Sequence, residues 1–144
     1  METTTIRLSG RFKPADAALT AVSIPAPIFF KMPAKKKLTI ESFSVECYLP
    51  TGQTATLRLF VIDPLDKSGI EPLKYEIPLT YRATLNIDST NPSAELRDIW
   101  AMDHLVRAYV PQAMRLQLDG TRGYFRHGLG GVDMIITGFY EDVP

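Results

Sequence analysis

The most restrictive feature of the chain is an alternation of apolar and polar residues over positions 75–88, YEIPLTYRATLNID. Apolar side chains occupy the odd positions from Tyr75 to Ile87, and polar residues occupy most of the even ones. A repeat of two residues is the period of a β-strand, in which successive side chains point to opposite faces. The segment therefore predicts a half-buried strand. Pro78 has no N–H to donate to a neighbour, so it places this strand at a sheet edge or interrupts it.

A second alternating segment, KKLTIESFSVECYLP at residues 36–50, changes phase once. Apolar residues lie on even positions at Leu38 and Ile40, and on odd positions from Phe43 to Leu49. One extra residue in a strand moves every later side chain to the opposite face, as a β-bulge does. The phase change predicts a bulge near Glu41.

Short alternating segments separated by prolines and glycines fill most of the remaining chain. A turn at Pro50–Gly52 leads into a segment carrying Leu57, Leu59 and Val61, so we expect a long hairpin here. Residues 132–140 are apolar on both faces, which is typical of a central strand. Further strands are expected at residues 4–9, 19–24, 28–32, 105–110 and 114–118.

Many short strands punctuated by turns indicate a sandwich or a barrel. We predict an all-β fold, a single domain over residues 1–144 with an extended N-terminal segment. The expected architecture is a two-sheet antiparallel sandwich, jelly-roll-like, of about eight strands. The pattern does not separate jelly-roll from immunoglobulin-like strand order, because both show the same alternation.

One segment has helical spacing. In residues 93–104, Ser93 is a suitable N-cap, and Leu96, Ile99 and Trp100 fall at positions i, i+3 and i+4. We expect either one short helix near 93–104 or an irregular connection with a single helical turn.

The charge balance disfavours a protein that coats nucleic acid. Sixteen basic residues match sixteen acidic ones, whereas such binding depends on neutralising phosphates. The one basic run, Lys35–Lys37, is predicted to be a solvated turn and not a phosphate contact. No apolar run is long enough to cross a membrane, and the N-terminus lacks a secretory signal. We therefore expect a soluble protein made in the cytoplasm, with neither nucleic acid nor membrane as a partner.

No catalytic or metal-binding motif is present in the sequence. Cys47, His104 and His127 lie far apart and do not have the spacing of a zinc site or a nucleophile–base pair. The segment DPLDKSG at 63–69 lacks the ligand spacing of a calcium loop, so a polar turn is expected. Cys47 alternates with apolar residues and is predicted to be a buried thiol. No cofactor, metal or catalytic residue is predicted.

A hydrolase remains a third hypothesis, because two carboxylates need only converge in space. It would require a cleft, and no role is assigned to any residue. The strand-borne candidates are Glu41, Glu46, Glu76 and Asp133.

The glycine-rich segment TRGYFRHGLGG at 121–131 combines two cations with two aromatic rings. Its glycines follow neither a dinucleotide-binding nor a P-loop spacing, so a phosphate cradle is not expected. We predict a permissive connection that makes an inter-subunit contact or, as the alternative, a contact with a sugar. The candidate contact residues are Arg122, Tyr124, Phe125, Arg126 and His127, with Trp100 as a candidate ring on a second loop and Asp119 as a polar partner.

Three segments together resemble small phage and bacterial jelly-roll proteins of the capsid-decoration and virion-associated type. They are MPAKKKLTIESFSVECYLPTGQTATLRLFVI, HLVRAYVPQAMRLQL and VDMIITGFYEDVP. The resemblance covers about the C-terminal two thirds of the chain and transfers no functional residue. It implies a structural role on a particle surface, often as a trimer, without catalysis.

Beside the hydrolase, two hypotheses of function follow from the sequence. The first is a non-enzymatic structural protein, a virion-associated or decoration subunit of a bacteriophage capsid, whose partners are its own copies and a larger assembly. The alternative is a lectin-like carbohydrate-binding sandwich that uses the aromatic side chains of its loops.

Overall fold

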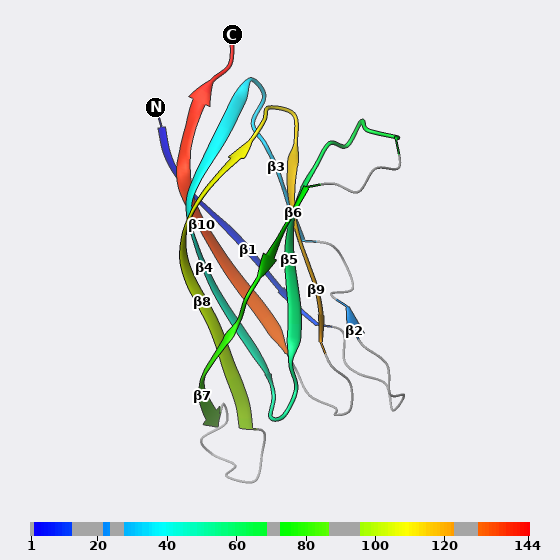
Figure 1. Cartoon of the computed structure of the whole chain (residues 1–144), viewed down its shortest axis with the longest axis vertical. Coiled ribbons are helices and arrows are strands. Elements are labelled where there is room, and N and C mark those ends of the chain that lie inside the picture. The colour runs from blue at the N-terminus through cyan, green and yellow to red at the C-terminus, as the bar shows by residue number, and fades with distance from the viewer. Residues whose placement is uncertain (1, 13–21, 24–27, 69–72, 87–95, 123–129) are drawn as a thin grey trace.

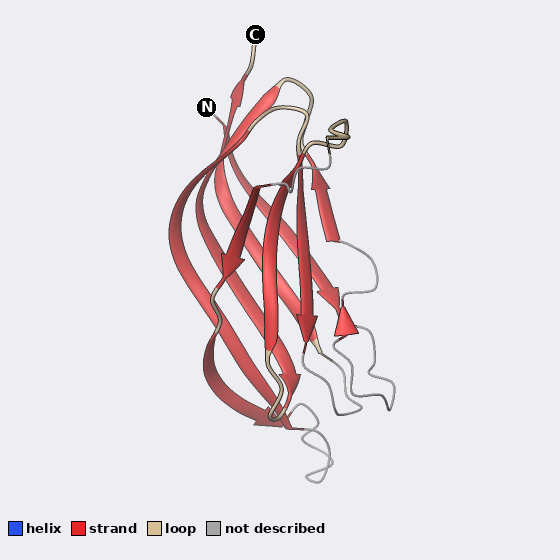
Figure 2. Cartoon of the chain, turned by 45° about the vertical axis from the view of Figure 1, so that its right-hand side comes forward, coloured by secondary structure: helices blue, strands red, loops and turns tan. Residues whose placement is uncertain are grey.

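The structure, a computed structural model, describes residues 2–12, 22–23, 28–68, 73–86, 96–122 and 130–144. The described residues form ten strands in two antiparallel sheets that face one another (Figures 1 and 2). The predicted all-β, two-sheet antiparallel sandwich is confirmed. β1 begins and β10 ends at the same end of the sandwich (Figure 1).

The two sheets differ in the length of their strands. Sheet A contains, in spatial order, β1 (Glu2–Arg11), β10 (Gly131–Asp142), β4 (Lys36–Pro50), β8 (Leu96–Val110) and β7 (Thr80–Asn86). In sheet B, the short β2 (Val22–Ser23) and β3 (Ile28–Lys31) both pair with β9 (Arg115–Arg122), which is followed by β5 (Ala55–Ile62) and β6 (Leu73–Ile77).

The strand order is that of a jelly roll. If β2 and β3 count as one strand, and β7 is set aside as an additional edge strand paired with β8, the ten strands reduce to eight. The first then pairs with the eighth (β1·β10), the second with the seventh (β2/β3·β9), the third with the sixth (β4·β8) and the fourth with the fifth (β5·β6). This nested pairing, folded over into two sheets, distinguishes a jelly roll from an immunoglobulin-like sandwich.

The predicted hairpin of residues 36–62 is wrong. β4 belongs to sheet A and β5 to sheet B, so the turn between them carries the chain across the sandwich. Both edges of β4 already pair with other strands, β10 and β8, and leave no edge for β5. The buried Asp98 secures this crossing, because its carboxylate accepts hydrogen bonds from the Gly52 N–H (3.1 Å) and the Thr84 hydroxyl (2.7 Å).

The predicted helix near 93–104 is also wrong. Residues 96–104 belong to β8, and residues 93–95 lie outside the described part. In this segment β8 pairs with β4 on one side and, up to Ala101, with β7 on the other. These ladders override the local helical spacing, since tertiary context outweighs intrinsic propensity.

The two strand irregularities expected from the sequence are confirmed. The β10·β4 register shifts opposite Thr137 and Gly138, which leaves Glu41 as the extra, unpaired residue of a bulge. The alternating segment 75–88 breaks at Pro78, because β6 ends at Ile77 and β7 begins at Thr80. Both halves are edge strands, one in each sheet.

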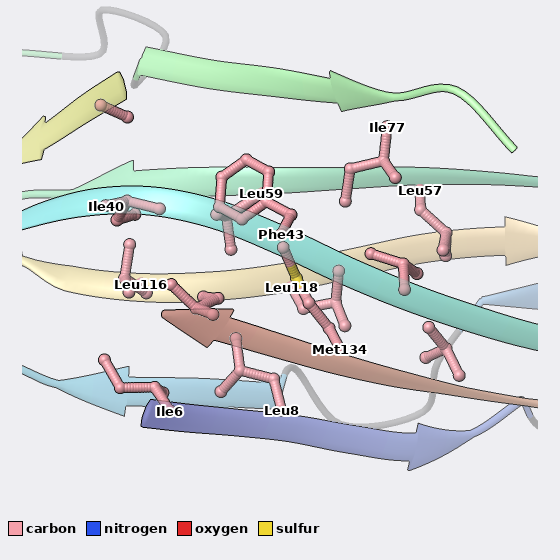
Figure 3. Close-up of a cluster of buried hydrophobic side chains, with 14 of the residues drawn as sticks. Ile6, Leu8, Ile40, Phe43, Leu57, Leu59, Ile77, Leu116, Leu118 and Met134 are labelled. Carbon is pink, nitrogen blue, oxygen red and sulfur yellow. The ribbon is translucent and has the colours of Figure 1, made fainter. Parts of the chain in front are cut away.

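The core lies between the sheets, and Figure 3 shows side chains from both sheets meeting there. Ile40 and Phe43 are both buried even though they lie on opposite sides of the phase change, because the bulge restores the inward face. The Cys47 thiol is fully buried, as predicted, and burial raises its pKa to about 12.

Of the predicted basic turn, only Lys35 lies in a turn, because Lys36 and Lys37 begin β4 and pair with residues near the two ends of the chain. Lys36 forms ion pairs with Asp142 (2.7 Å) and Glu2 (3.5 Å), and Lys37 pairs with Glu141. The Val143 N–H donates to the Lys35 carbonyl at 2.8 Å. Among the described residues there is no helix that could span a membrane.

Candidate functional site

The outer face of sheet A, the face turned away from sheet B, presents two surfaces of different chemistry. The register places side chains in rows that cross β1, β10 and β4. On one side of the bulge the rows carry charged side chains around a hollow, and on the other side one row carries the two rings of Phe139 and Tyr109. Side chains within a row are direct neighbours because they point to the same face.

The first surface, which we call the charged groove, is an open hollow of about 370 Å³ on β1, β10 and β4. Two cross-strand rows form it. One row contains Ser9, Asp133 and Glu46, and the next contains Arg11, Gly131 and Tyr48. The full lining is Arg7, Ser9, Gly10, Arg11, Glu46, Tyr48, Val132 and Asp133.

A two-pronged ion pair forms one wall of the charged groove. The Arg7 Nε and Nη2 donate to the two carboxylate oxygens of Asp133 at 2.8 and 2.9 Å. The hydrogen bond to Asp133 raises the pKa of the Arg7 guanidinium above its usual value. Paired contacts of this kind fix the orientation of both partners, so the Asp133 carboxylate is held in place.

Tyr48 and Gly131 shape the other end of the groove. A Cβ on Gly131 would lie 2.5 Å from the Tyr48 hydroxyl and 2.6 Å from the adjoining ring carbon. The ring therefore lies directly over the glycine, and a larger residue there would displace it. Next to this position the Phe12 N–H donates to the Gly130 carbonyl (2.9 Å), which joins the end of β1 to the start of β10.

Two charged groups of the groove have no ion-pair partner within the described part of the chain. These are Glu46 on β4 and Arg11 on β1. Two inter-strand spacings, about 10 Å in total, separate β1 from β4. Glu46 also lies directly opposite Asp133, and like charges in that position destabilise a sheet unless something bridges them.

The second surface, which we call the β8 surface, consists of Leu105, Tyr109 and Phe139. Tyr109 and Phe139 flank Thr39 in one cross-strand row. Leu105 is 83% exposed and Tyr109 is 61% exposed. β7 pairs only with residues 96–101 of β8, so the outer edge of residues 102–110 has no partner strand among the described residues.

The predicted contact residues are only partly within the described structure. Arg122 is the last residue of β9, with its backbone opposite Val22 and Ala55. The other four, Tyr124, Phe125, Arg126 and His127, lie outside the described residues.

Trp100 lies within β8 and not in a loop. Its ring packs against the core and meets the Tyr81 ring edge to face, with centroids 5.7 Å apart. The Trp100 Nε1 is buried and has no hydrogen-bond partner among the described residues. The register explains this placement, because the Trp100 backbone lies opposite both Cys47 and Tyr81.

Of the four carboxylates considered from the sequence, the structure brings two together. Glu46 and Asp133 are cross-strand neighbours in the charged groove. Glu41 lies at the bulge, and Glu76 pairs with Arg58 on sheet B. Sequence reasoning missed Arg7, Arg11 and Tyr48, because only the register of β1 on β10 and of β10 on β4 places them around those carboxylates.

The segment 63–68 forms a polar turn, as predicted. The Asp63 carboxylate accepts the Leu65 N–H, and the Asp66 carboxylate accepts the Ser68 N–H. The Ser68 backbone hydrogen bond lowers the pKa of Asp66. In the described ranges, no group of three or more His, Cys, Asp or Glu side chains could hold a metal ion.

Comparison of the chain with protein-family models, with curated proteins and with solved structures returns no match.

Proposed function

We propose that this protein is a non-enzymatic structural subunit that acts through protein–protein contacts, and that the β8 surface is its principal contact. The observation that supports the proposal is where the exposed apolar side chains lie. Among the described residues, nine large apolar side chains are exposed, and five of them lie on β7 and β8. These five are Tyr81, Leu85, Leu96, Leu105 and Tyr109, of which Leu105 and Tyr109 belong to the β8 surface.

Exposed apolar side chains next to an unpaired strand edge favour association for two reasons. Burying apolar surface contributes roughly 25 cal/mol per Å². An unpaired strand also offers a row of N–H and C=O groups to another chain. In β8 only Asp103 and Arg107 give the outer edge of residues 102–110 an exposed charge, which is weak protection for so long a strand.

The proposed partners are other copies of this chain and a larger assembly such as a capsid. A self-complementary contact between two β8 surfaces would give a twofold dimer, whereas a head-to-tail contact closes into a ring such as a trimer. The resemblance to virion-associated jelly-roll proteins supports a ring on a particle surface.

Sedimentation velocity tests the proposal. The wild-type protein is expected to form a concentration-dependent oligomer, and Leu105→Lys combined with Tyr109→Lys should shift it to the monomer. Leu65→Lys is the matched control, because Leu65 is 81% exposed but lies in the turn at residues 63–68. A wild-type protein that is monomeric at every concentration and binds no particle contradicts the proposal.

A further inference from the structure

We propose that the charged groove on sheet A binds a neutral saccharide, with Glu46 and Arg11 as its hydrogen-bonding residues and the Tyr48 ring as its apolar platform. The groove is separate from the β8 surface, since it lies on β1, β10 and β4. The proposal therefore does not rest on the assembly function, and either can fail without the other.

The size of the hollow suits one or two sugar rings. Its volume of about 370 Å³ is near the lower end of small-ligand sites, which are typically about 300–1,000 Å³. It is open along the sheet and not enclosed, so a ring within a longer glycan could enter without its neighbours being excluded.

The charge of the groove indicates a neutral ligand. Arg7 and Arg11 balance Glu46 and Asp133, so the formal charges of the lining cancel. A phosphate or a nucleic-acid backbone would meet two carboxylates, and a simple cation would meet two guanidinium groups. An apolar ligand would leave Glu46 and Arg11 with neither water nor a partner among the described residues, which is costly.

Hydroxyl groups match the hydrogen bonds that the groove leaves unsatisfied. An ionised carboxylate has about four acceptor positions, and Asp133 uses two of them for Arg7. Glu46 accepts no hydrogen bond from a described side chain, and Arg11 supplies donors on the opposite side of the groove. A polyol can donate to both carboxylates at once, and this bridges the like charges of Glu46 and Asp133.

Tyr48 supplies the contact that polar groups cannot. Its ring lies over Gly131 at the end of the groove. An aromatic ring offers apolar area together with one polar tip, which suits the C–H face of a pyranose and an adjacent hydroxyl. The groups come from three adjacent strands in continuous register, so little ordering is needed on binding.

Backbone amide NMR during titration with methyl glycosides of glucose, galactose and mannose tests this site. We expect perturbed Gly10, Tyr48 and Gly131 amides with at least one glycoside at millimolar concentration. Glu46→Gln should weaken that binding about tenfold, the loss expected for one hydrogen bond to a charged group. Tyr48→Leu should abolish it, and Tyr48→Phe should retain it.

Glu41→Gln is the matched control. Glu41 is also an exposed glutamate of β4, but it lies at the bulge outside the groove, so its substitution should leave binding unchanged. The absence of perturbation with every glycoside would overturn the proposal. Equal loss in Glu41→Gln and Glu46→Gln would also overturn it, as would preferential binding of free glycine or alanine, which carry both charges.

Discussion

The charged groove and the β8 surface lie on the same face of the same sheet, yet their side chains suit different kinds of partner. The groove offers charged side chains, one of them held in an ion pair, and the Tyr48 ring, which lies over Gly131. The β8 surface offers exposed apolar side chains beside a strand edge that no described strand pairs with. The first suits a small polar molecule, and the second suits another protein.

The bulge at Glu41 accounts for part of this difference. Before the bulge the residues that β4 contributes to the hydrophobic core are Leu38 and Ile40, and after it they are on odd positions from Phe43 to Leu49. The outward residues therefore change from Thr39, between two rings, to Ser44 and Glu46. One inserted residue lets a single strand keep a continuous core on its inner face while its outer face changes chemistry.

The largest expected effect comes from glycine substitutions on either side of that bulge. A Cβ on Gly138 would lie 2.1 Å from the Thr39 carbonyl oxygen, so backbone must move. We expect Gly138→Ala to lower the free energy of unfolding by about 3 kcal/mol. In Gly131→Ala the clash is with the end of the Tyr48 side chain, which can rotate, so the loss should be at most about 1 kcal/mol.

Urea denaturation of both variants measures this difference. Gly131→Ala should also weaken any glycoside binding in the groove, because the Tyr48 ring is displaced. A loss in Gly138→Ala as small as that expected for Gly131→Ala would mean that the bulge tolerates a side chain, contrary to the close approach at Gly138.

The next largest expected effect is on the rate of thiol modification, which compares how readily the strands beneath the groove and at the β8 edge open locally. Cys47 lies on β4 beneath the groove, paired on both sides, whereas Ala108 lies on β8 next to the unpaired edge. Both side chains are buried. We expect a thiol at Ala108→Cys, in a Cys47→Ala background, to react with a thiol reagent about tenfold faster than native Cys47, because edge strands open locally.

Rates measured at neutral pH across a range of reagent concentrations provide the comparison. Burial raises the Cys47 pKa to about 12, so its reaction in the folded state should be slow at neutral pH and should follow opening of the structure. If Cys47 reacts as fast as the new thiol, the two regions open together and the β8 edge is not the weaker part.

The sequence predicted the interior of this fold better than its connections. Strict alternation identified the sheet-forming segments, the bulge near Glu41 and the break at Pro78, because periodicity reports which face is buried. It could not report which strands are neighbours, and for that reason the hairpin of residues 36–62 was wrong. The helical spacing at Leu96, Ile99 and Trp100 was overridden by ladders to distant strands.

The groove could not have been found from local patterns. Arg7, Glu46 and Asp133 are far apart in sequence and become neighbours only through the registers of β1 on β10 and β10 on β4. Their outward parity was visible, but a shift of one residue in either register would have sent the same side chains to the core face. The glycine-rich segment 121–131, in contrast, is visible as a candidate site in the sequence because its unusual residues are contiguous.

A smaller effect on stability is expected when the Arg7–Asp133 ion pair of the groove is removed, and it tests whether this pair has a positioning role. Arg7 and Asp133 are both solvent-accessible, so Arg7→Gln should shift the urea midpoint only slightly, and less at high salt. Removing the guanidinium leaves the carboxylates of Asp133 and Glu46 side by side. We therefore expect glycoside affinity to fall more clearly than stability. Arg58→Gln, which breaks a comparable surface pair with Glu76 on sheet B, is the control and should leave affinity unchanged.

The smallest expected effect is at the end of sheet A remote from the groove, where Lys36 joins Asp142 and Glu2. The Lys36 hydrogen bond lowers the pKa of Asp142, so the pair contributes stability above the unfolded carboxylate value, about 4, and loses it as pH falls through the folded pKa. The Asp142 hydrogen bond raises the pKa of Lys36, so the same contribution is present below about pH 10.4 and is lost as pH rises through the folded pKa.

The Val143 amide, which is hydrogen-bonded to the Lys35 carbonyl, should report the acidic transition in its chemical shift, with a midpoint below the ordinary aspartate pKa. Lys36→Met should return that midpoint to the ordinary value, while the Gly131 amide in the groove should not follow it. An unchanged Val143 midpoint in the variant would show that Lys36 does not hold the chain end, and a matching transition at Gly131 would show that the two ends of sheet A do not respond independently.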